Sequence, residues 1–329
     1  MIKVGYIGFG KFAQHRHSIL LDTSDLNVVG YFDPNRSLVE EYGLTNFESA
    51  DLLLDELDAV IISVPPFFAA DLCKNALSKG VHVFCEKPPA TKLSDLDGLE
   101  GFPDHLILAY GFNHRLHDSI MTIKEIIDSN EMGKILWMRG RYGKEVDDTY
   151  KDNWRCDKKL NGGGILIDQG IHLLDVMDWL AGGFDVTQAI LSDSFLEIEG
   201  VEDNAFLNLY SSVSNVAASL HSTITQWRYL FSLEIFLEKG SLVLNGLRTS
   251  SGKYGEEILH IRPLTPDGQL NDQQLEYSTN KSWGREMESF IYSINNVTAY
   301  PHSGLAEAKN IMKLIESVYS NATWANFDQ

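Results

Sequence analysis

A glycine-rich turn at the beginning of the chain restricts the possible fold more than any other feature of the sequence. Residues 1–7 alternate as a strand does and lead directly into Gly8-Phe9-Gly10-Lys11-Phe12-Ala13, which has the spacing G-x-G-x-x-A. In that pattern Gly8 allows a tight turn, Gly10 lets a pyrophosphate approach the backbone, and Ala13 lets the next helix pack on the strand. The sequence therefore predicts a dinucleotide-binding unit in which residues 8–13 contact the cofactor.

An acidic residue follows the second predicted strand, residues 27–32. Asp33 lies roughly 20 residues beyond the glycines, where a ribose-binding carboxylate is expected. A carboxylate there accepts hydrogen bonds from ribose hydroxyls and repels a 2′-phosphate, which favours NAD. Arg36 would support a 2′-phosphate, so NADP stays open as the alternative. The structural alternative for Asp33 is a helix N-cap before Pro34.

Strand and helix patterns then alternate, which predicts right-handed βαβ units and a mostly parallel sheet. The predicted strands are residues 58–64, 81–85 and 105–110, and the predicted helices are residues 68–79 and 95–101. Ligands of such sheets bind beyond the carboxyl ends of the strands. The residues that this places beside the cofactor are Ser63, Val64, Pro65, Glu86 and Lys87.

Lys87 has two interpretations. A lysine in a loop is ordinarily a solvated surface charge. This one precedes two prolines, which restrict the backbone, and a lysine in a stiff loop at the cofactor can stabilise a reacting oxygen. Its spacing alone does not decide between them.

The second part of the chain has a different pattern. A helix at 119–130 precedes several strand-like runs, separated by turn signals, which predict a large, open, mainly antiparallel sheet. These runs are residues 135–142, 187–198, 205–210, 216–225, 231–238, 241–244 and 257–261, and helices at 283–296 and 304–321 close the chain. We therefore predict a dinucleotide-binding Rossmann domain over 1–118 and an α+β domain for substrate and oligomerisation over 119–329. A homodimer or homotetramer would cover the open sheet.

Residues 161–179 predict a buried helix, because apolar side chains cover most of its surface. At about 100° per residue, Asp168, His172, Asp175 and Trp179 fall on one face, within roughly 60° of one another. A buried carboxylate and imidazole need partners, so they form either a structural pair or a ligand site. The glycines at 162–164 would let a substrate approach the start of the helix.

The composition excludes several functions. A net charge of −19 argues against nucleic acid and anionic membranes as partners. The sequence has no apolar run of membrane length and no signal peptide, which predicts a cytoplasmic protein. Cys73, Cys85 and Cys156 form no CxxC pair, so we expect neither a disulfide framework nor a metal site.

Three segments together resemble the Gfo/Idh/MocA family (glucose–fructose oxidoreductase and inositol dehydrogenase). They are Gly8-Phe9-Gly10, Glu86-Lys87-Pro88 and Gly162-Gly163-Gly164-x-Leu-x-Asp168-x-Gly170-x-His172-x-x-Asp175. The resemblance spans the chain and implies an N-terminal Rossmann domain, a C-terminal domain with a large open sheet, and bound NAD(P). It also implies a sugar, cyclitol or sugar-nucleotide substrate.

The resemblance also implies roles for particular residues. Lys87 corresponds to the catalytic lysine, Asp168 to the acid that orients the substrate, and His172 to the general acid/base. Family residues that lie near the nicotinamide and the substrate are matched in this sequence by Tyr110, Asn113, Arg115, Trp154 and Arg155. Residues 64–69 lack the histidine that is common in the family after the fourth strand. Residues 245–255 are similar to members encoded with surface-polysaccharide sugar genes.

The sequence therefore predicts reversible hydride transfer between a secondary alcohol carbon and the nicotinamide. His172 would take the hydroxyl proton, because imidazole titrates near neutral pH. Two alternatives stay open: an NAD-sensing binding protein that has lost the chemistry, and a reductase of C=N bonds of the imine or bilin type. Side chains that would line a pocket for a charged sugar are Trp154, Arg155, Arg248, Lys253 and Tyr254.

Overall fold

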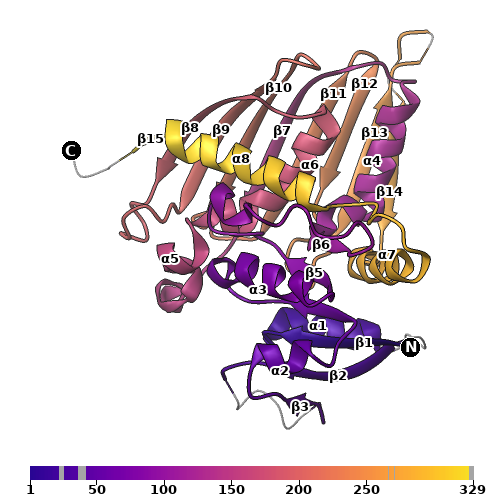
Figure 1. The fold of residues 1–329 in the computed structure, drawn as a ribbon. Coiled ribbons are helices and arrows are strands. Elements are labelled where there is room, and N and C mark those ends of the chain that lie inside the picture. The colour runs from indigo at the N-terminus through magenta and orange to yellow at the C-terminus, as the bar shows by residue number, and fades with distance from the viewer. Residues whose placement is uncertain (22–25, 36–41, 266, 270, 326–329) are drawn as a thin grey trace. The chain divides into compact units, whose positions relative to one another are not determined.

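The computed structural model describes residues 1–21, 26–35, 42–265, 267–269 and 271–325 (Figure 1). The chain divides into two compact units, Met1–Asn113 with Trp283–Met312, and His114–Ser282 with Lys313–Gln329. The first boundary between the two units, between Asn113 and His114, lies close to the predicted boundary after residue 118. Residues 283–312, however, pack with the first unit, although the sequence analysis placed them in the second domain. Arg36 lies outside the described residues.

The first unit contains a six-stranded parallel sheet with the order β3-β2-β1-β4-β5-β6. Its strands are β1 (Ile2–Ile7), β2 (Leu26–Phe32), β3 (Thr45–Asn46), β4 (Ala59–Ile62), β5 (His82–Glu86) and β6 (Leu108–Gly111). Its N-terminal helices are α1 (Lys11–Leu20), α2 (Ala50–Leu54), α3 (Pro66–Ser78) and the short η2 (Leu93–Leu96). The strand order and the parallel pairing confirm the predicted Rossmann arrangement.

Burial explains the strands of this sheet. All four residues of β4, Ala-Val-Ile-Ile, are buried, as expected for a central parallel strand with both faces covered. Two more helices contribute to the unit: α7 (Ser282–Asn296) and the first part of α8 (Leu305–Asn321). Met287 and Phe290 of α7 join the core formed by β1, β2 and β5. This packing is why the C-terminal segment belongs to the N-terminal unit.

The second unit contains a nine-stranded sheet with the order β14-β13-β12-β11-β7-β10-β9-β8-β15. Its first strands are β7 (Ile135–Gly143), β8 (Val186–Ser192), β9 (Asn204–Ser211) and β10 (Val216–Thr223). The others are β11 (Leu230–Leu237), β12 (Gly240–Asn245), β13 (Glu257–Pro263), β14 (Gln273–Tyr277) and β15 (Thr323–Trp324). Only the β7–β10 and β8–β15 pairs among these described strands are parallel, so the predicted mainly antiparallel sheet is confirmed.

One face of this sheet is covered by helices, among them α6 (Ile171–Ala181), whereas the opposite face carries exposed side chains (Figure 1). Side chains alternate along β9, where exposed Phe206, Asn208 and Tyr210 lie between buried residues. On the covered face, a Cβ at Gly140 of β7 would lie 2.7 Å from Met177 Sδ of α6. Gly140 therefore lets α6 pack close to the sheet.

The predicted helix over residues 161–179 is wrong as a continuous α-helix. Its first part is η6 (Leu166–Gly170), a π-helix in which the Ile171 amide donates to the Leu166 carbonyl five residues back. Only from Ile171 does α6 follow with ordinary α geometry. A π-turn inserts one residue, so Asp168 is rotated by about 100° relative to the positions that an unbroken α-helix would give it. His172, Asp175 and Trp179 keep their common face.

Other elements also differ from the prediction. The helix expected at 95–101 is only the short η2, and the strand expected at 187–198 ends at Ser192. The strands β3, β14 and β15 have no counterpart in the sequence analysis. Strands β3 and β15 have only two residues each. Strand β14 is polar and mostly exposed, so it lacks the alternation of buried and exposed residues that predicts a strand.

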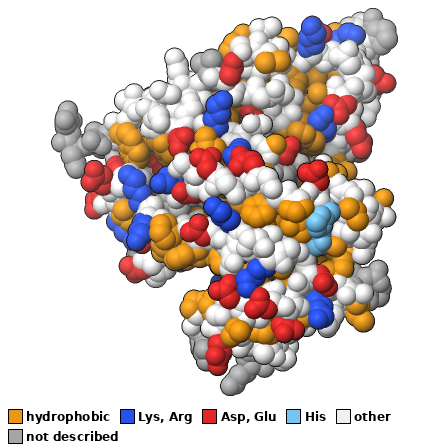
Figure 2. Space-filling model, viewed as in Figure 1, with side chains coloured by type: hydrophobic (Ala, Val, Ile, Leu, Met, Phe, Trp, Pro, Cys, Tyr) orange, Lys and Arg blue, Asp and Glu red, His pale blue; other side chains and the backbone are white. Residues whose placement is uncertain are grey.

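Acidic and basic side chains are interspersed on the face drawn in Figure 2. In the described part of the chain, no helix combines the length and hydropathy needed to cross a bilayer. Within the same residues, no group of three or more His, Cys, Asp or Glu side chains could hold a metal ion.

Candidate active site

The glycine turn has the geometry that its sequence predicts. Gly8 has a φ of +80°, and a Cβ there would lie 2.3 Å from the carbonyl oxygen of Ser63. Gly10 precedes α1 and, among the described residues, a Cβ there would meet nothing within 4 Å. The beginning of α1 therefore has the open approach that a pyrophosphate requires. Lys11 is exposed and Ala13 is buried, so the helix packs closely behind the turn.

Asp33 lies against this turn, directly after β2. Its Oδ2 accepts from the amide of Phe9 at 2.8 Å, and its Oδ1 accepts from the amide of Asn35 at 2.8 Å. The carboxylate therefore holds two backbone amides, one in each loop. The Phe9 side chain is buried and stacks on Tyr31 with ring centroids 4.7 Å apart, so only its backbone can face a cofactor.

The other predicted cofactor residues lie at strand ends. Ser63, Val64 and Pro65 follow β4 directly, and the Ser63 amide donates to the Ile7 carbonyl. Phe12 is partly exposed and stacks on the ring of Trp283. Ser63, Val64 and Pro65 therefore lie at the edge where a parallel sheet binds ligands.

Glu86, the last residue of β5, belongs to a buried ion-pair network just before Lys87. Arg16 of α1 has no exposed surface and donates to Glu86 at 2.5 Å and to Glu286 of α7 at 2.8 Å. Burial raises the pKa of Glu286 to about 8, and the nearby Arg16 opposes that rise. The network therefore ties the helix after the glycine turn to the Glu86-Lys87-Pro88 loop, where Lys87 is partly exposed.

The predicted substrate contact through Tyr110 does not fit the position of its side chain. Tyr110 is fully buried in β6, and burial, followed by the nearby Cys73 and Cys85, raises the pKa of its hydroxyl. Its side chain is part of the core of the first unit and cannot reach a ligand without moving. Asn113, at the end of this unit, is also buried.

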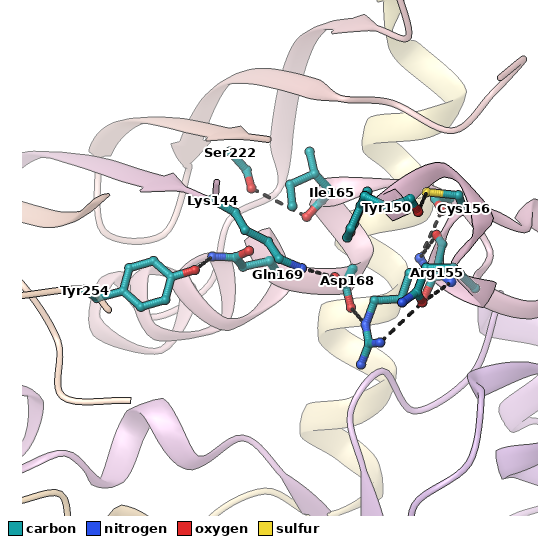
Figure 3. A network of polar contacts seen from close by, with 12 residues as sticks. Lys144, Tyr150, Arg155, Cys156, Ile165, Asp168, Gln169, Ser222 and Tyr254 are labelled. Atoms are coloured by element: carbon teal, nitrogen blue, oxygen red, sulfur yellow. Dashed lines mark hydrogen bonds and ion pairs between the residues drawn. The ribbon is translucent and has the colours of Figure 1, made fainter. Parts of the chain in front are cut away.

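In the second unit, two cations meet Asp168 (Figure 3). Arg155 Nε donates to Asp168 Oδ1 at 3.0 Å, and Lys144 Nζ lies 3.9 Å from Oδ2. Arg155 comes from η5 (Trp154–Cys156) and also lies over the ring of its neighbour Trp154. The structure thus brings together the predicted residues Trp154, Arg155 and Asp168.

Lys144 follows β7 immediately and is held by aromatic and acidic neighbours. Its Nζ lies 4.5 Å from the ring centroid of Tyr150. Burial lowers the pKa of Lys144, and Asp168 opposes that shift. A lysine with a lowered pKa and a nearby carboxylate is typical of a functional site.

Gln169, next to Asp168, points in another direction and donates from Nε2 to the hydroxyl of Tyr254 (Figure 3). Tyr254 packs edge-on against Tyr142, with ring centroids 5.1 Å apart. Burial raises the pKa of both hydroxyls, so they stay protonated and act as hydrogen-bonding groups. Lys253 lies over the ring of Tyr229, whereas Arg248 is held by the Tyr277 carbonyl and by Glu276.

His172 lies in the first turn of α6 and is partly exposed. Its ring stacks on that of His114, with centroids 3.9 Å apart and planes 16° apart. The predicted substrate residue Arg115 instead makes a bidentate bond to Asp175, at 2.7 and 2.6 Å, and lies over Trp179. Arg115 therefore holds α6.

The glycines at 162–164 have a structural role that corrects the prediction of substrate approach. A Cβ at Gly163 would lie 2.1 Å from Tyr319 Oη, and a Cβ at Gly164 would lie 2.0 Å from the Glu202 carbonyl oxygen. Glu202 is fully buried and accepts from the amides of Gly164 and Leu166, both at 2.8 Å. Burial raises its pKa to about 7. Glu202 thus caps the beginning of η6.

Sequence reasoning missed His114, Tyr142, Lys144 and Gln169. Two of them had a usable signal: His114 stands inside Gly111-Phe112-Asn113-His114-Arg115, and Lys144 directly follows a predicted strand. Gln169 is next to Asp168 in the sequence, whereas Tyr142 is linked to the site only through long-range packing. No spacing rule identifies contacts of that kind.

An open glycine turn at a Rossmann strand end, with a cluster of ionisable groups on a second sheet domain, defines an NAD-dependent oxidoreductase. Residues 2–100 match the domain described as oxidoreductase family, NAD-binding Rossmann fold, and residues 120–243 match the GFO/IDH/MocA C-terminal domain. The chain belongs to the Gfo/Idh/MocA family of oxidoreductases, as the sequence predicted.

Two relatives and one solved structure illustrate the similarity. Glucose-6-phosphate 3-dehydrogenase of Bacillus subtilis (strain 168) is 30% identical over 90% of this chain and 89% of its own length. D-glucoside 3-dehydrogenase of Escherichia coli (strain K12) is 31% identical over 60% of this chain and 58% of its own. Levoglucosan dehydrogenase in complex with NADH superimposes with a TM-score of 0.84 at 18% identity, over 97% and 96% of the two chains, which shows the shared fold.

Proposed function

We propose that this chain is an NAD-dependent dehydrogenase that oxidises the C3 hydroxyl of an anionic hexose, a sugar phosphate in particular. The supporting observation is the Asp168 carboxylate between Arg155 and Lys144, on η6, which directly precedes the helix α6 that carries His172. Lys144 and Arg155 are cations that would attract an anionic group, in a protein of net charge −19. The two relatives described above are named as 3-dehydrogenases, which supports oxidation at C3.

In the proposed reaction, His172 accepts the proton of the C3 hydroxyl, and Asp168 accepts a hydrogen bond that orients the sugar. Lys87 stabilises the negative charge that develops on the same oxygen. The nicotinamide, when bound, takes the hydride from C3, and the product is a 3-keto sugar. His172 must be neutral to act as the base, which suits a group with a reference pKa near 6.5.

The residues of the first unit would hold the cofactor. The amides at the beginning of α1 bind the pyrophosphate beyond Gly8 and Gly10, and Asp33 binds the adenosine ribose. Since Asp33 is a carboxylate, we propose NAD as the cofactor in preference to NADP. The remaining cofactor contacts come from Phe9, Lys11, Phe12, Ala13, Ser63, Val64, Pro65, Glu86 and Asn113.

Lys144 and Arg155 would recognise the anionic group, together with Lys253 from the loop that carries Tyr254. A charge-assisted hydrogen bond contributes about 1.5–3 kcal/mol, or roughly 10- to 100-fold in binding. We therefore expect kcat/KM to be higher for glucose 6-phosphate than for glucose. Lys144→Met is expected to lower the ratio of kcat/KM for glucose 6-phosphate to kcat/KM for glucose by roughly 10-fold or more.

The experiment measures NADH formation from both sugars with the wild type, with Lys144→Met and with the exposed control Lys239→Met. The ratio is the decisive quantity, because a general loss of activity lowers both rates alike. A wild type that prefers glucose, or a ratio that Lys144→Met leaves unchanged, would contradict the proposal.

We also propose that the exposed face of the nine-stranded sheet forms a homo-oligomer and that the protein acts in the cytoplasm. Neighbouring strands align Ile190, Phe206, His221 and Arg141 in one row on that face. A hollow of about 900 Å³ lies over these strands. The three cysteines are free and buried, as in a reducing compartment.

A further inference from the structure

We propose that His114 is a positioning residue for His172: its ring is the surface on which the catalytic imidazole is held. The inference rests on the proposed role of His172 as the general base. It starts from the parallel stack of the two rings, at 3.9 Å and 16°. In that geometry the ring edges do not face each other, so the contact fixes orientation without transferring a proton.

His114 is itself held rigidly. Only 4% of its surface is exposed, and its Nε2 is hydrogen-bonded to Tyr142 Oη at 3.0 Å. That bond prevents the ring from rotating, and Tyr142 belongs to the central strand β7. The ring of His117 also packs against His114, with ring centroids 5.5 Å apart, and the Nδ1 of His117 bonds to the buried Glu257 at 3.0 Å. The partly exposed His172 thus stacks on a buried, hydrogen-bonded His114.

The neighbouring pair sets the register between the two elements. His114 and Arg115 are adjacent in η3 (Asn113–Leu116), and His172 and Asp175 are three residues apart on one face of α6. Because Arg115 donates two hydrogen bonds to Asp175, the position of η3 along α6 is fixed. His114 is therefore always opposite His172.

Orientation matters because proton transfer requires the imidazole nitrogen within hydrogen-bond reach of the hydroxyl. A misplacement of about 1 Å can cost on the order of 100-fold in rate. Any flat ring at position 114 would provide the surface that orients His172.

The test compares His114→Ala and His114→Phe with the wild type in the full-length protein. For His114→Ala we expect kcat to fall roughly 10- to 100-fold, while KM for the sugar changes by less than about 3-fold. For His114→Phe we expect recovery of most of that loss, because the flat ring is restored. The control is His105→Ala, which removes an exposed histidine of the first unit and should leave kcat unchanged.

A second readout does not depend on activity. The ring protons of His172 should show an upfield ring-current shift in the NMR spectrum of the wild type and of His114→Phe, but not of His114→Ala. Wild-type kcat in His114→Ala, or no rescue by His114→Phe, would overturn the inference while leaving His172 as the base. If His172→Ala itself kept the wild-type kcat, the proposed function would fail instead.

Discussion

Asp168 and His172 are four residues apart in the sequence, yet different neighbours hold them. Asp168 contacts Arg155 and Lys144, whereas His172 stacks on His114. The carboxylate therefore lies in a cationic environment and the imidazole in an aromatic one. This difference suits an acid that orients a substrate and a base that accepts its proton.

Replacing His172 tests its role directly. We expect His172→Ala to lower kcat by about 10²–10⁴, the range for loss of a general acid–base group. NAD binding should be retained, because the cofactor residues belong to the other unit. The measurements are the turnover rate and the dissociation constant for NAD, with His260→Ala of β13 as the control. Wild-type turnover in His172→Ala would refute the assignment.

The sequence could identify Asp168, His172 and Lys87 as candidates because each stands in a recognisable local pattern. It could not assign their neighbours. The partners of Asp168 come from two other segments, the end of β7 and η5, and no spacing rule links those segments to residue 168. It also misplaced Tyr110, since a buried and an exposed tyrosine have the same local sequence.

At the scale of elements, the π-helix η6 is the main departure from expectation. An apolar run after three glycines predicts a helix whose start a substrate can approach closely, but hydrogen bonds to the distant Glu202 decide the local geometry. The alternation in β9 predicted that strand correctly, because one face is buried and the other exposed. The polar strand β14 has no such contrast between a buried face and an exposed face.

The glycine at 164 provides a test of this element. We expect Gly164→Ala to lower the free energy of unfolding by about 3 kcal/mol or more, because its Cβ would collide with the backbone of Glu202. The matched control is Gly284→Ala in α7, where a Cβ meets no described atom within 4 Å. That variant should gain about 0.5–1 kcal/mol from helix propensity. Urea denaturation measures both, and equal stabilities would show that residue 164 tolerates a side chain.

At the scale of the whole molecule, the two compact units differ from the two domains that the sequence analysis predicts. Residues 283–312 return to the first unit, because the apolar face of α7 packs on the core near β1 and β5. A linear reading of the sequence assigns a C-terminal helix to the preceding domain. Only long-range packing shows otherwise.

The exposed sheet face belongs to this scale too. It presents several large, partly exposed apolar side chains, namely Trp137, Ile190, Phe206 and Tyr210. If this face joins two copies, Phe206→Glu should reduce the mass measured by light scattering to that of a single chain. Val213→Glu, in the exposed turn after β9, should leave the mass unchanged. A wild type that is already monomeric would contradict the proposal.

The most direct test of the proposed reaction follows the hydrogen on one carbon. Glucose 6-phosphate with deuterium at C3 alone is incubated with the protein and NAD, and the reduced cofactor is analysed by mass spectrometry. Oxidation at C3 predicts that the reduced cofactor carries one deuterium, with none in the His172→Ala reaction over the same time. Reduced cofactor without deuterium, or no turnover of this sugar, would contradict it.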